Sequence, residues 1–227
     1  MVATKIFLDR TLINGQLSGL YAITESQAKL DDQYLKKIEI LLKGGVSIIQ
    51  YRNKNNDKLN QFDFLIKLKL LCNKNNALLI INDDLQLSKK LDADGIHLGK
   101  NDCSLNDAKE ILGNNKIIGV SCYNDLSLAI IAEQQGADYV AFGRFFPSKT
   151  KPDAVQAEID LLQQAKKQLH IPIVAIGGIT MQNARQVINA GADMIAVIDG
   201  LFSQADLFET ARTLANNFSG DHHGRTL

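Results

Sequence analysis

Short apolar runs alternate with amphipathic segments along the chain from residue 19 onward. Most of the runs are almost continuously apolar and rich in β-branched residues, a pattern typical of strands covered on both faces, as in a parallel sheet. The eight predicted strands span residues 19–24, 46–52, 78–83, 95–99, 117–122, 139–144, 171–178 and 194–200.

The segments between the runs predict helices. Residues 31–44 begin with two acids and end with Lys43 and Gly44, as the helix dipole and C-cap preferences require. Ser104 is expected to cap a short helix. Further helices are predicted within residues 58–72, 125–136, 158–169, 180–191 and 204–218, and residues 85–94 form the weakest pattern.

An Ala-Asp pair comes just before three of the predicted strands, at residues 93–94, 137–138 and 192–193. This repetition indicates that one device joins helix to strand several times. Eight alternating strand and helix segments predict an α/β protein, a single-domain (β/α)8 TIM barrel over residues 19–218. Residues 1–18 are expected to pack on the barrel as an N-terminal extension, and residues 219–227 to form a flexible tail. An open doubly wound sheet is the alternative, but no GxGxxG follows the first strand.

Composition and charge indicate which partners and which cellular compartment to expect. The formal net charge is zero, which gives no reason to expect nucleic acid or an anionic membrane as a partner. Three cysteines at unrelated spacings favour a reducing compartment over disulfides or a zinc site. Residues 1–16 lack the apolar run of a signal peptide, and no window approaches the roughly 18 apolar residues of a membrane span. We therefore expect a cytoplasmic location.

Acids follow two neighbouring predicted strands. In a barrel the carboxyl ends of the strands carry the chemistry, which makes these positions informative. Asp83 ends the third strand and Asp102 follows the fourth, and one or two carboxylates are what a protein usually supplies to Mg²⁺. The alternatives are that residues 82–84 only cap the next helix and that Asp102 is a turn residue.

Cations, hydroxyls and glycines occupy the other strand ends. Arg52 and Lys54 follow the second strand, residues 148–151 read Ser-Lys-Thr-Lys, and Gly177-Gly178 ends the seventh strand. Such groups bind phosphate, so two anion sites are predicted, one for a diphosphate with Mg²⁺ and one for a monophosphate. Solvated loop charges and turn geometry are the alternatives.

No histidine is expected at the rim. His97 lies inside an apolar strand and is expected to be a hydrogen-bonded core residue, and no histidine is close in sequence to Ser121 and Cys122. This argues against triad-type nucleophilic catalysis and against histidine acid-base chemistry. Loss of a metal-bound diphosphate needs neither, because charge neutralisation of the leaving group suffices.

Seven motifs in series resemble the thiamine-phosphate synthase family over about residues 19–210: IIQYRNK, IINDDLQL, ADGIHLGKND, IGVSC, FFPSKTKPDA, IPIVAIGGIT and GADMIAVI. The resemblance implies a transferase of thiamine biosynthesis. Such an enzyme joins hydroxymethylpyrimidine diphosphate to a thiazole phosphate and releases diphosphate. It implies a dissociative mechanism, in which a pyrimidine methylene cation forms and the thiazole nitrogen captures it, with one Mg²⁺ ion per active site.

The resemblance also implies roles for individual residues. Asp83 and Asp102 would bind Mg²⁺, and Lys151, Ser121 and Arg52 would be catalytic, with Lys151 on the departing diphosphate. The pyrimidine diphosphate would be lined by Gln50, Tyr51, Arg52, Asn53, Lys54, Asn82 and Ser121. The thiazole phosphate would be held by Ser148, Lys149, Thr150, Gly178, Ile198 and Asp199.

Three positions depart from the family pattern. Ser148 replaces the more usual Thr, Asp199 stands where Ser is usual, and Lys100 where an uncharged amide is common. A related thiazole tautomerase is one rival, but the sequence lacks that enzyme's histidine near the fifth strand. A non-catalytic phosphate-ligand sensor is another, although it would not need Lys151 or the acid pair. Small-molecule substrates are the expected partners, and a homo-oligomer is left open.

Overall fold

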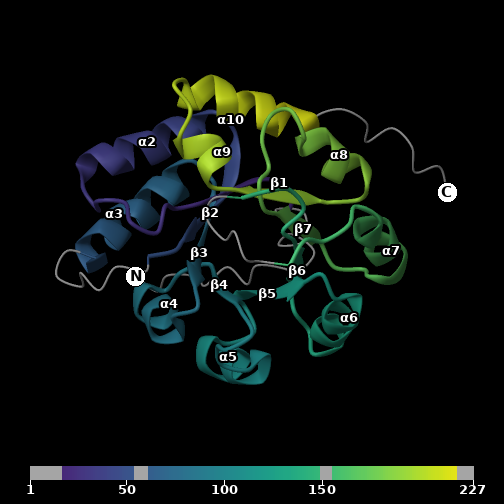
Figure 1. Cartoon of the computed structure of the whole chain (residues 1–227). Helices are drawn as coiled ribbons and strands as arrows, with labels where there is room; N and C mark the ends of the chain where they lie inside the picture. Colours follow the sequence, from purple (N-terminus) through teal and green to yellow (C-terminus); the bar gives the residue numbers. More distant parts are fainter. Residues whose placement is uncertain (1–16, 54–60, 149–154, 219–227) are drawn as a thin grey trace.

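The computed structural model describes residues 17–53, 61–148 and 155–218. Eight parallel strands follow one another around a closed barrel in chain order (Figure 1), which confirms the predicted (β/α)8 fold. The strands are β1 (Gly19–Ile23), β2 (Val46–Tyr51), β3 (Leu78–Asn82), β4 (Gly95–Leu98), β5 (Ile117–Tyr123), β6 (Tyr139–Phe142), β7 (Ile173–Ile176) and β8 (Met194–Val197).

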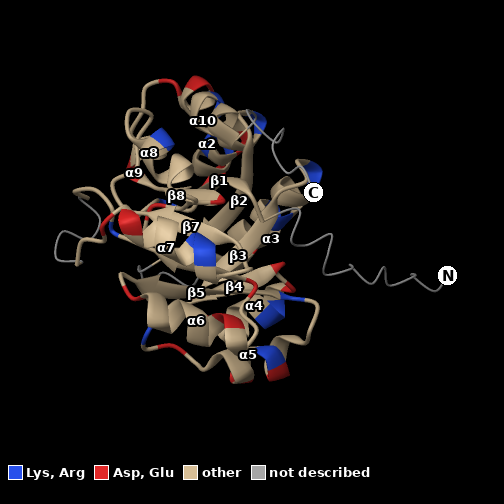
Figure 2. Cartoon of the chain, turned by 90° about the vertical axis from the view of Figure 1, so that its right-hand side faces the viewer, with Lys and Arg blue, Asp and Glu red and all other residues tan. Residues whose placement is uncertain are grey.

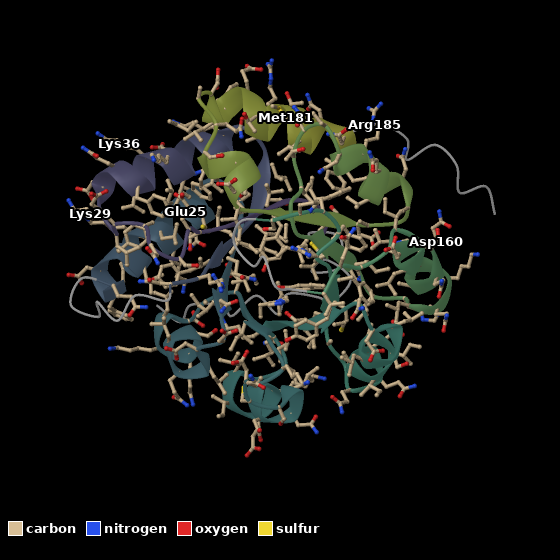
Figure 3. The ribbon with its side chains drawn as sticks, in the orientation of Figure 1. Glu25, Lys29, Lys36, Asp160, Met181 and Arg185 are labelled. Carbon is tan, nitrogen blue, oxygen red and sulfur yellow. The ribbon has the colours of Figure 1, made fainter. Side chains whose placement is uncertain are left out.

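Helices form a ring outside the strands (Figure 1). They are α2 (Asp32–Lys43), α3 (Gln61–Lys74), α4 (Leu85–Leu91), α5 (Leu105–Leu112), α6 (Leu126–Gln134), α7 (Asp160–Gln168), α8 (Ala184–Asn189), α9 (Asp199–Phe202), α10 (Leu207–Ala215) and the 3-10 turn η1 (Asn216–Phe218). The short helix α9, directly after β8, was not expected from the sequence. In Figure 3 the labelled side chains of Lys36 on α2 and Asp160 on α7 point outward at the perimeter, as an amphipathic ring requires.

Alternation along the strands divides the apolar residues into two cores. On β2, Ile49 and Tyr51 pack outward against the helices, whereas Ile48 joins the cluster inside the barrel. Leu17 also belongs to the interior cluster and is 1% exposed, so the packing of the barrel begins before β1. Residues 1–16 and 219–227, expected as extension and tail, lie outside the described residues.

The aspartates of the three Ala-Asp pairs make the same hydrogen bonds to the preceding strand. Asp94 accepts a hydrogen bond from the backbone N–H of Leu79 at 2.7 Å, and its own N–H donates to the carbonyl of the same residue. Asp138 pairs in this way with Ile118, and Asp193 with Ile173. Each aspartate therefore fixes the start of its strand against the strand before it, as the repetition in the sequence predicted.

The surface of the described residues carries both signs of charge. Figure 2 shows acidic and basic positions interspersed over the helices on this side of the molecule, in keeping with the zero net charge. None of the helices in the described part of the chain has the length and apolar character that crossing a bilayer requires. Cys72, Cys103 and Cys122 are all free thiols.

Candidate active site

A cavity of about 320 Å³ opens at the carboxyl ends of the strands. Its lining combines polar side chains from β2 to β5 with a glycine-rich wall from the segments after β6, β7 and β8. The polar lining includes Gln50, Arg52, Asn82, His97, Ser121, Tyr123, Arg144, Ser148, Thr180, Asp199 and Gln204. This is the end of a β/α barrel at which active sites are built.

Two carboxyl groups meet beside this cavity. The side chains of Asp83 and Asp102 lie within hydrogen-bonding reach of each other, which disfavours loss of the Asp83 proton. Partial burial, and then the neighbouring carboxyl, raise the pKa of Asp83 to about 6, and the positive charge of Arg52 opposes the rise. The arrangement favours a divalent cation, because a cation would replace that proton and neutralise both acids.

Local backbone hydrogen bonds hold the two segments that carry these acids. Asp83 has a φ of 62°, in the left-handed region that aspartate tolerates better than most residues, and its N–H donates to the carbonyl of His97 on β4. Asp102 accepts a hydrogen bond of 2.6 Å from the N–H of Gly99. Tyr123 holds the same loop by accepting a hydrogen bond of 3.0 Å from the N–H of Lys100.

Asp84 and Ser104, in contrast to Asp83 and Asp102, are helix N-cap residues. Asp84 caps α4 and accepts from the N–H of Leu87 at 2.9 Å. Ser104 caps α5 in a capping box with Asp107. The helix-capping alternative for the acids after β3 therefore holds for Asp84, while Asp83 is left to face Asp102.

A chain of hydrogen bonds crosses the barrel at the floor of the cavity, through residues that line it. Gln50 Nε2 donates to the hydroxyl of Tyr21 at 2.8 Å, and that hydroxyl lies 2.9 Å from the hydroxyl of Tyr139. His97 Nδ1 lies 3.0 Å from the Tyr139 hydroxyl, and His97 Nε2 lies 2.8 Å from Ser121 Oγ.

The expectation that no histidine is available at the rim is therefore wrong, because His97 lines the cavity and contacts Ser121. His97 and Ser121 are far apart in sequence, but β4 and β5 are neighbouring parallel strands, with His97 paired to Gly119. Ser121 lies two residues beyond Gly119 and thus on the same face of the strand, directly above the histidine. The expectation that His97 is hydrogen bonded inside the barrel is confirmed.

The opposite wall of the cavity depends on glycine. Gly178 has a φ of 65°, and a Cβ at this position would lie 2.3 Å from the carbonyl oxygen of Pro147. Asn183 stabilises the turn, because its Nδ2 donates to the carbonyl of Gly178 and its Oδ1 accepts from the N–H of Thr180. The turn after β7 is thereby pressed against the segment after β6 that carries Ser148.

The structure brings most of the expected binding residues together. Gln50, Arg52, Asn82, Ser121, Ser148, Gly178, Ile198 and Asp199 all line the cavity. Tyr51 does not, because its ring faces outward against Phe64 with centroids 6.4 Å apart, and Asn53 donates to the Tyr51 hydroxyl. Lys54, Lys149, Thr150 and Lys151 lie outside the described residues.

Several cavity residues were missed by the sequence reading: Tyr21, His97, Tyr123, Tyr139, Arg144, Thr180 and Gln204. The aromatic residues lie within or at the ends of apolar strands, where they look like ordinary core residues. Arg144 is a cation directly after β6. Its position at a strand end is the signal in the sequence that could have identified it as a cavity residue.

The chain matches a family model described as thiamine monophosphate synthase over residues 20–201. It is 47% identical over 206 residues to the thiamine-phosphate synthase of Nitrosococcus oceani, covering 91% of this chain and 95% of the relative. It is 49% identical over 203 residues to that of Nitrosomonas eutropha, covering 89% and 95%.

Solved structures agree with the sequence relatives. The thiamine phosphate pyrophosphorylase of Pyrococcus furiosus superimposes with a TM-score of 0.80 at 33% identity, over 91% of this chain and 98% of the other. A geranylgeranylglyceryl phosphate synthase from Thermoplasma acidophilum, with a TM-score of 0.68 at 18% identity over 94% and 98%, shares the fold alone. On its matched length and identity, this chain belongs to the thiamine monophosphate synthase family.

Proposed function

We propose that this chain is a thiamine-phosphate synthase. It joins hydroxymethylpyrimidine diphosphate to a thiazole phosphate and releases diphosphate. Family membership and relatives of that name support the activity. The observation that carries the assignment of the site is the contact between the Asp83 and Asp102 carboxyls, which lie next to Arg52 and directly after Asn82, two residues that line the cavity.

Asp83 and Asp102 would hold one Mg²⁺ ion. Within the described ranges, no three His, Cys, Asp or Glu side chains gather into a larger metal cluster. A site with two protein carboxylates suits Mg²⁺, which usually takes its other ligands from water and substrate phosphate. When bound there, the ion would neutralise charge on the diphosphate leaving group.

Side chains of the protein would bind the diphosphate and the pyrimidine. Arg52 is 9% exposed and hydrogen bonded to Ser26, so its guanidinium is held in position next to the acid pair, where it can bind a phosphate. Asn82 and Ser121 would contact the pyrimidine substrate. Lys151, carried over from the family pattern alone, would stabilise the diphosphate as it leaves, so Lys151→Ala should lower kcat more than it raises KM.

The turn at Gly177-Gly178 and the backbone at residues 198–199 would bind the thiazole phosphate. Both line the same cavity as the pyrimidine side. This allows the thiazole nitrogen to reach the methylene carbon once diphosphate has left. Asp199 is exposed at the start of α9, so recognition by backbone N–H groups would tolerate its carboxylate.

The direct test is to mix the protein with both substrates and Mg²⁺ and to measure thiamine phosphate and released diphosphate together. Equal amounts of the two products are expected. Absence of thiamine phosphate with properly folded protein and saturating Mg²⁺ would refute the assignment.

A second test separates the metal site from the fold. Asp83→Ala and Asp102→Ala should each reduce turnover at least roughly a hundredfold, as removal of a key electrostatic group commonly does. Asp84→Ala is the matched control, because this neighbouring acid caps α4 and should affect stability more than turnover. Near-normal turnover of both Asp83 and Asp102 variants at limiting Mg²⁺ would rule out the metal assignment.

A further inference from the structure

The hydrogen-bond chain from Gln50 to Ser121 crosses the barrel through side chains that are almost inaccessible to water. Tyr21 is 1% exposed, Tyr139 0%, Gln50 3% and His97 8%. Among the hydrogen bonds of the described residues, Gln50 Oε1 and the Ser121 hydroxyl hydrogen are the groups at the two ends of this chain that face a ligand in the cavity. A buried polar chain of this kind requires an explanation, because each hydroxyl hydrogen in it must find an acceptor.

The direction of donation follows step by step from the amide end. Gln50 Nε2 carries only hydrogens, so Tyr21 must accept there. The other hydrogen-bond partner of the Tyr21 hydroxyl is Tyr139, so its hydrogen points to Tyr139. Tyr139 then accepts from Tyr21 and must give its own hydrogen to His97 Nδ1. Burial raises the pKa of both phenols, which keeps both hydrogens in place.

The same logic fixes the histidine and the serine. Since Nδ1 of His97 accepts, the neutral ring carries its hydrogen on Nε2 and donates it to Ser121 Oγ, 2.8 Å away. The Ser121 hydroxyl already accepts from the histidine, so its own hydrogen is directed to the cavity. His97 in this state cannot remove a proton from Ser121, and the pair is therefore unlike a nucleophilic serine-histidine dyad.

The barrel is built around this arrangement. Tyr139 is paired with Gly119 across β5 and β6, and a Cβ on Gly119 would lie 2.0 Å from the Tyr139 ring. The missing side chain makes room for the ring to stack on His97, with centroids 5.6 Å apart and planes 20° from parallel. Tyr139 also meets Tyr21 edge to face at a centroid distance of 6.1 Å.

We propose that Tyr21, Tyr139 and His97 are positioning residues that polarise the site, so that Ser121 directs its hydroxyl hydrogen to the substrate and Gln50 presents its Oε1 as an acceptor. This inference rests on the proposed function for its substrate. Phosphate oxygens and pyrimidine ring nitrogens accept hydrogen bonds, and the exocyclic amino group of an aminopyrimidine donates one. The two ends of the chain therefore match both kinds of group on the pyrimidine diphosphate.

The protein without substrate provides the first test. In the full-length chain labelled with ¹⁵N-histidine, nitrogen NMR at neutral pH distinguishes the two ring tautomers. The His97 signal is identified by its loss in His97→Asn. We expect His97 to be neutral with its hydrogen on Nε2, and a hydrogen on Nδ1 would overturn the proposal. This outcome does not depend on whether the protein makes thiamine phosphate.

Tyr139→Phe tests the origin of the tautomer. Loss of the hydroxyl should convert the single Nε2–H form of His97 into a mixture of tautomers. Tyr34→Phe is the matched control, because this buried hydroxyl accepts from the N–H of Glu25 and takes no part in the chain. If both variants keep only the Nε2–H form, Tyr139 does not set the tautomer and the proposal fails.

Activity supplies the final readout. Tyr139→Phe should lower kcat roughly five- to tenfold, the effect of about one hydrogen bond, with little change in KM. The double variant with Ser121→Ala should be no slower than Ser121→Ala alone, since the chain acts through that hydroxyl. Fully additive losses would show that Tyr139 acts by another route and would contradict the proposal.

Discussion

Asp83 combines two unfavourable features, a left-handed backbone and a carboxyl that lies against another carboxyl. Strain of this kind persists where the surrounding structure enforces it, and it collects at functional sites. In the proposed metal site this backbone conformation accompanies the contact with Asp102, whereas the neighbouring Asp84 has a negative φ and caps α4.

The raised pKa predicts how Asp83 affects stability. A carboxyl whose pKa rises from 3.8 to about 6 on folding holds its proton more tightly in the folded state, so its contribution to stability is lost as pH rises from about 4 to 6. Asp83→Asn removes this effect. Thermal unfolding without Mg²⁺ should therefore show a larger stabilisation by Asp83→Asn at pH 7 than at pH 4.

The same variant, Asp83→Asn, should also bind Mg²⁺ more weakly. Isothermal titration in the presence of inorganic diphosphate should show at least roughly tenfold weaker Mg²⁺ binding than in the unsubstituted protein, because one of the two carboxylate ligands is gone.

The prediction on pH has its own contradicting outcome. An equal gain in stability from Asp83→Asn at pH 7 and at pH 4 would show that the two carboxyls do not share a proton.

Gly178 provides a second prediction at the level of one residue. Gly178→Ala should raise KM for the thiazole phosphate at least roughly tenfold, because the added methyl would displace the carbonyls of Phe146 and Pro147 and the turn beside them. Steady-state kinetics with the pyrimidine substrate held at saturation measures this.

Gly113→Ala is the control for backbone strain. Gly113 also has a positive φ, 84°, but a Cβ there meets nothing within 4 Å. It should cost only about 1–2 kcal/mol of stability from the φ value and leave KM unchanged. A similar KM effect in both variants would show that strain, rather than the position of the turn, is responsible.

At the level of elements, the barrel is assembled from strands joined in pairs. Asp94, Asp138 and Asp193 stand before β4, β6 and β8, and each accepts from the odd-numbered strand before it. Side-chain and backbone bonds to one residue set the register at the amino end of each pair. The same register decides which side chains face the cavity at the carboxyl ends of the strands, since a slip by one residue would turn an inward side chain outward.

Asp94→Ala should lower the free energy of unfolding by about 2 kcal/mol, because a half-buried N–H of Leu79 loses a charged acceptor. Urea denaturation followed by circular dichroism measures this. Asp94→Asn retains an oxygen in the same place and should recover part of the loss. Equal losses in the two variants would mean that the charge, and not the acceptor geometry, matters most.

At the level of the whole molecule, the cavity draws on strands from around the barrel. Arg52 follows β2, Asn82 ends β3 and Ser121 lies on β5, while Gly177 and Gly178 follow β7 on the opposite wall. A ligand that contacts all of these ties separate strand ends together. Because it would bind the folded chain and not the unfolded one, it stabilises the folded state by an amount that grows with its concentration relative to the dissociation constant.

Inorganic diphosphate with Mg²⁺ should consequently raise the melting temperature more than either component alone. At about 100 times the dissociation constant, binding contributes about 2.7 kcal/mol, or roughly 5–10 °C for a domain of this size. Differential scanning fluorimetry measures the shift, and Asp83→Ala should abolish the excess due to Mg²⁺. Equal shifts with and without Mg²⁺ would argue against metal-linked diphosphate binding.

The barrel fold could be predicted from the sequence without the structure. Continuous apolar strands, capped helices such as the one at Ser104 and the repeated Ala-Asp pairs each depend on neighbours a few residues away, so local pattern sufficed. The sequence also indicated the rim residues, because the end of a strand is visible in it. Tyr51 was misread because residues one position apart on a strand face opposite sides, and the motif that contains it shows no such alternation.

Tertiary structure alone decided which residues meet. The pairing of Asp83 with Asp102, and the chain from Gln50 through Tyr21, Tyr139 and His97 to Ser121, join residues on different strands. Their contacts depend on strand register and on the empty space at Gly119, which no local pattern encodes. For the same reason a histidine that looked like an isolated core residue proved to lie against the serine at the floor of the cavity.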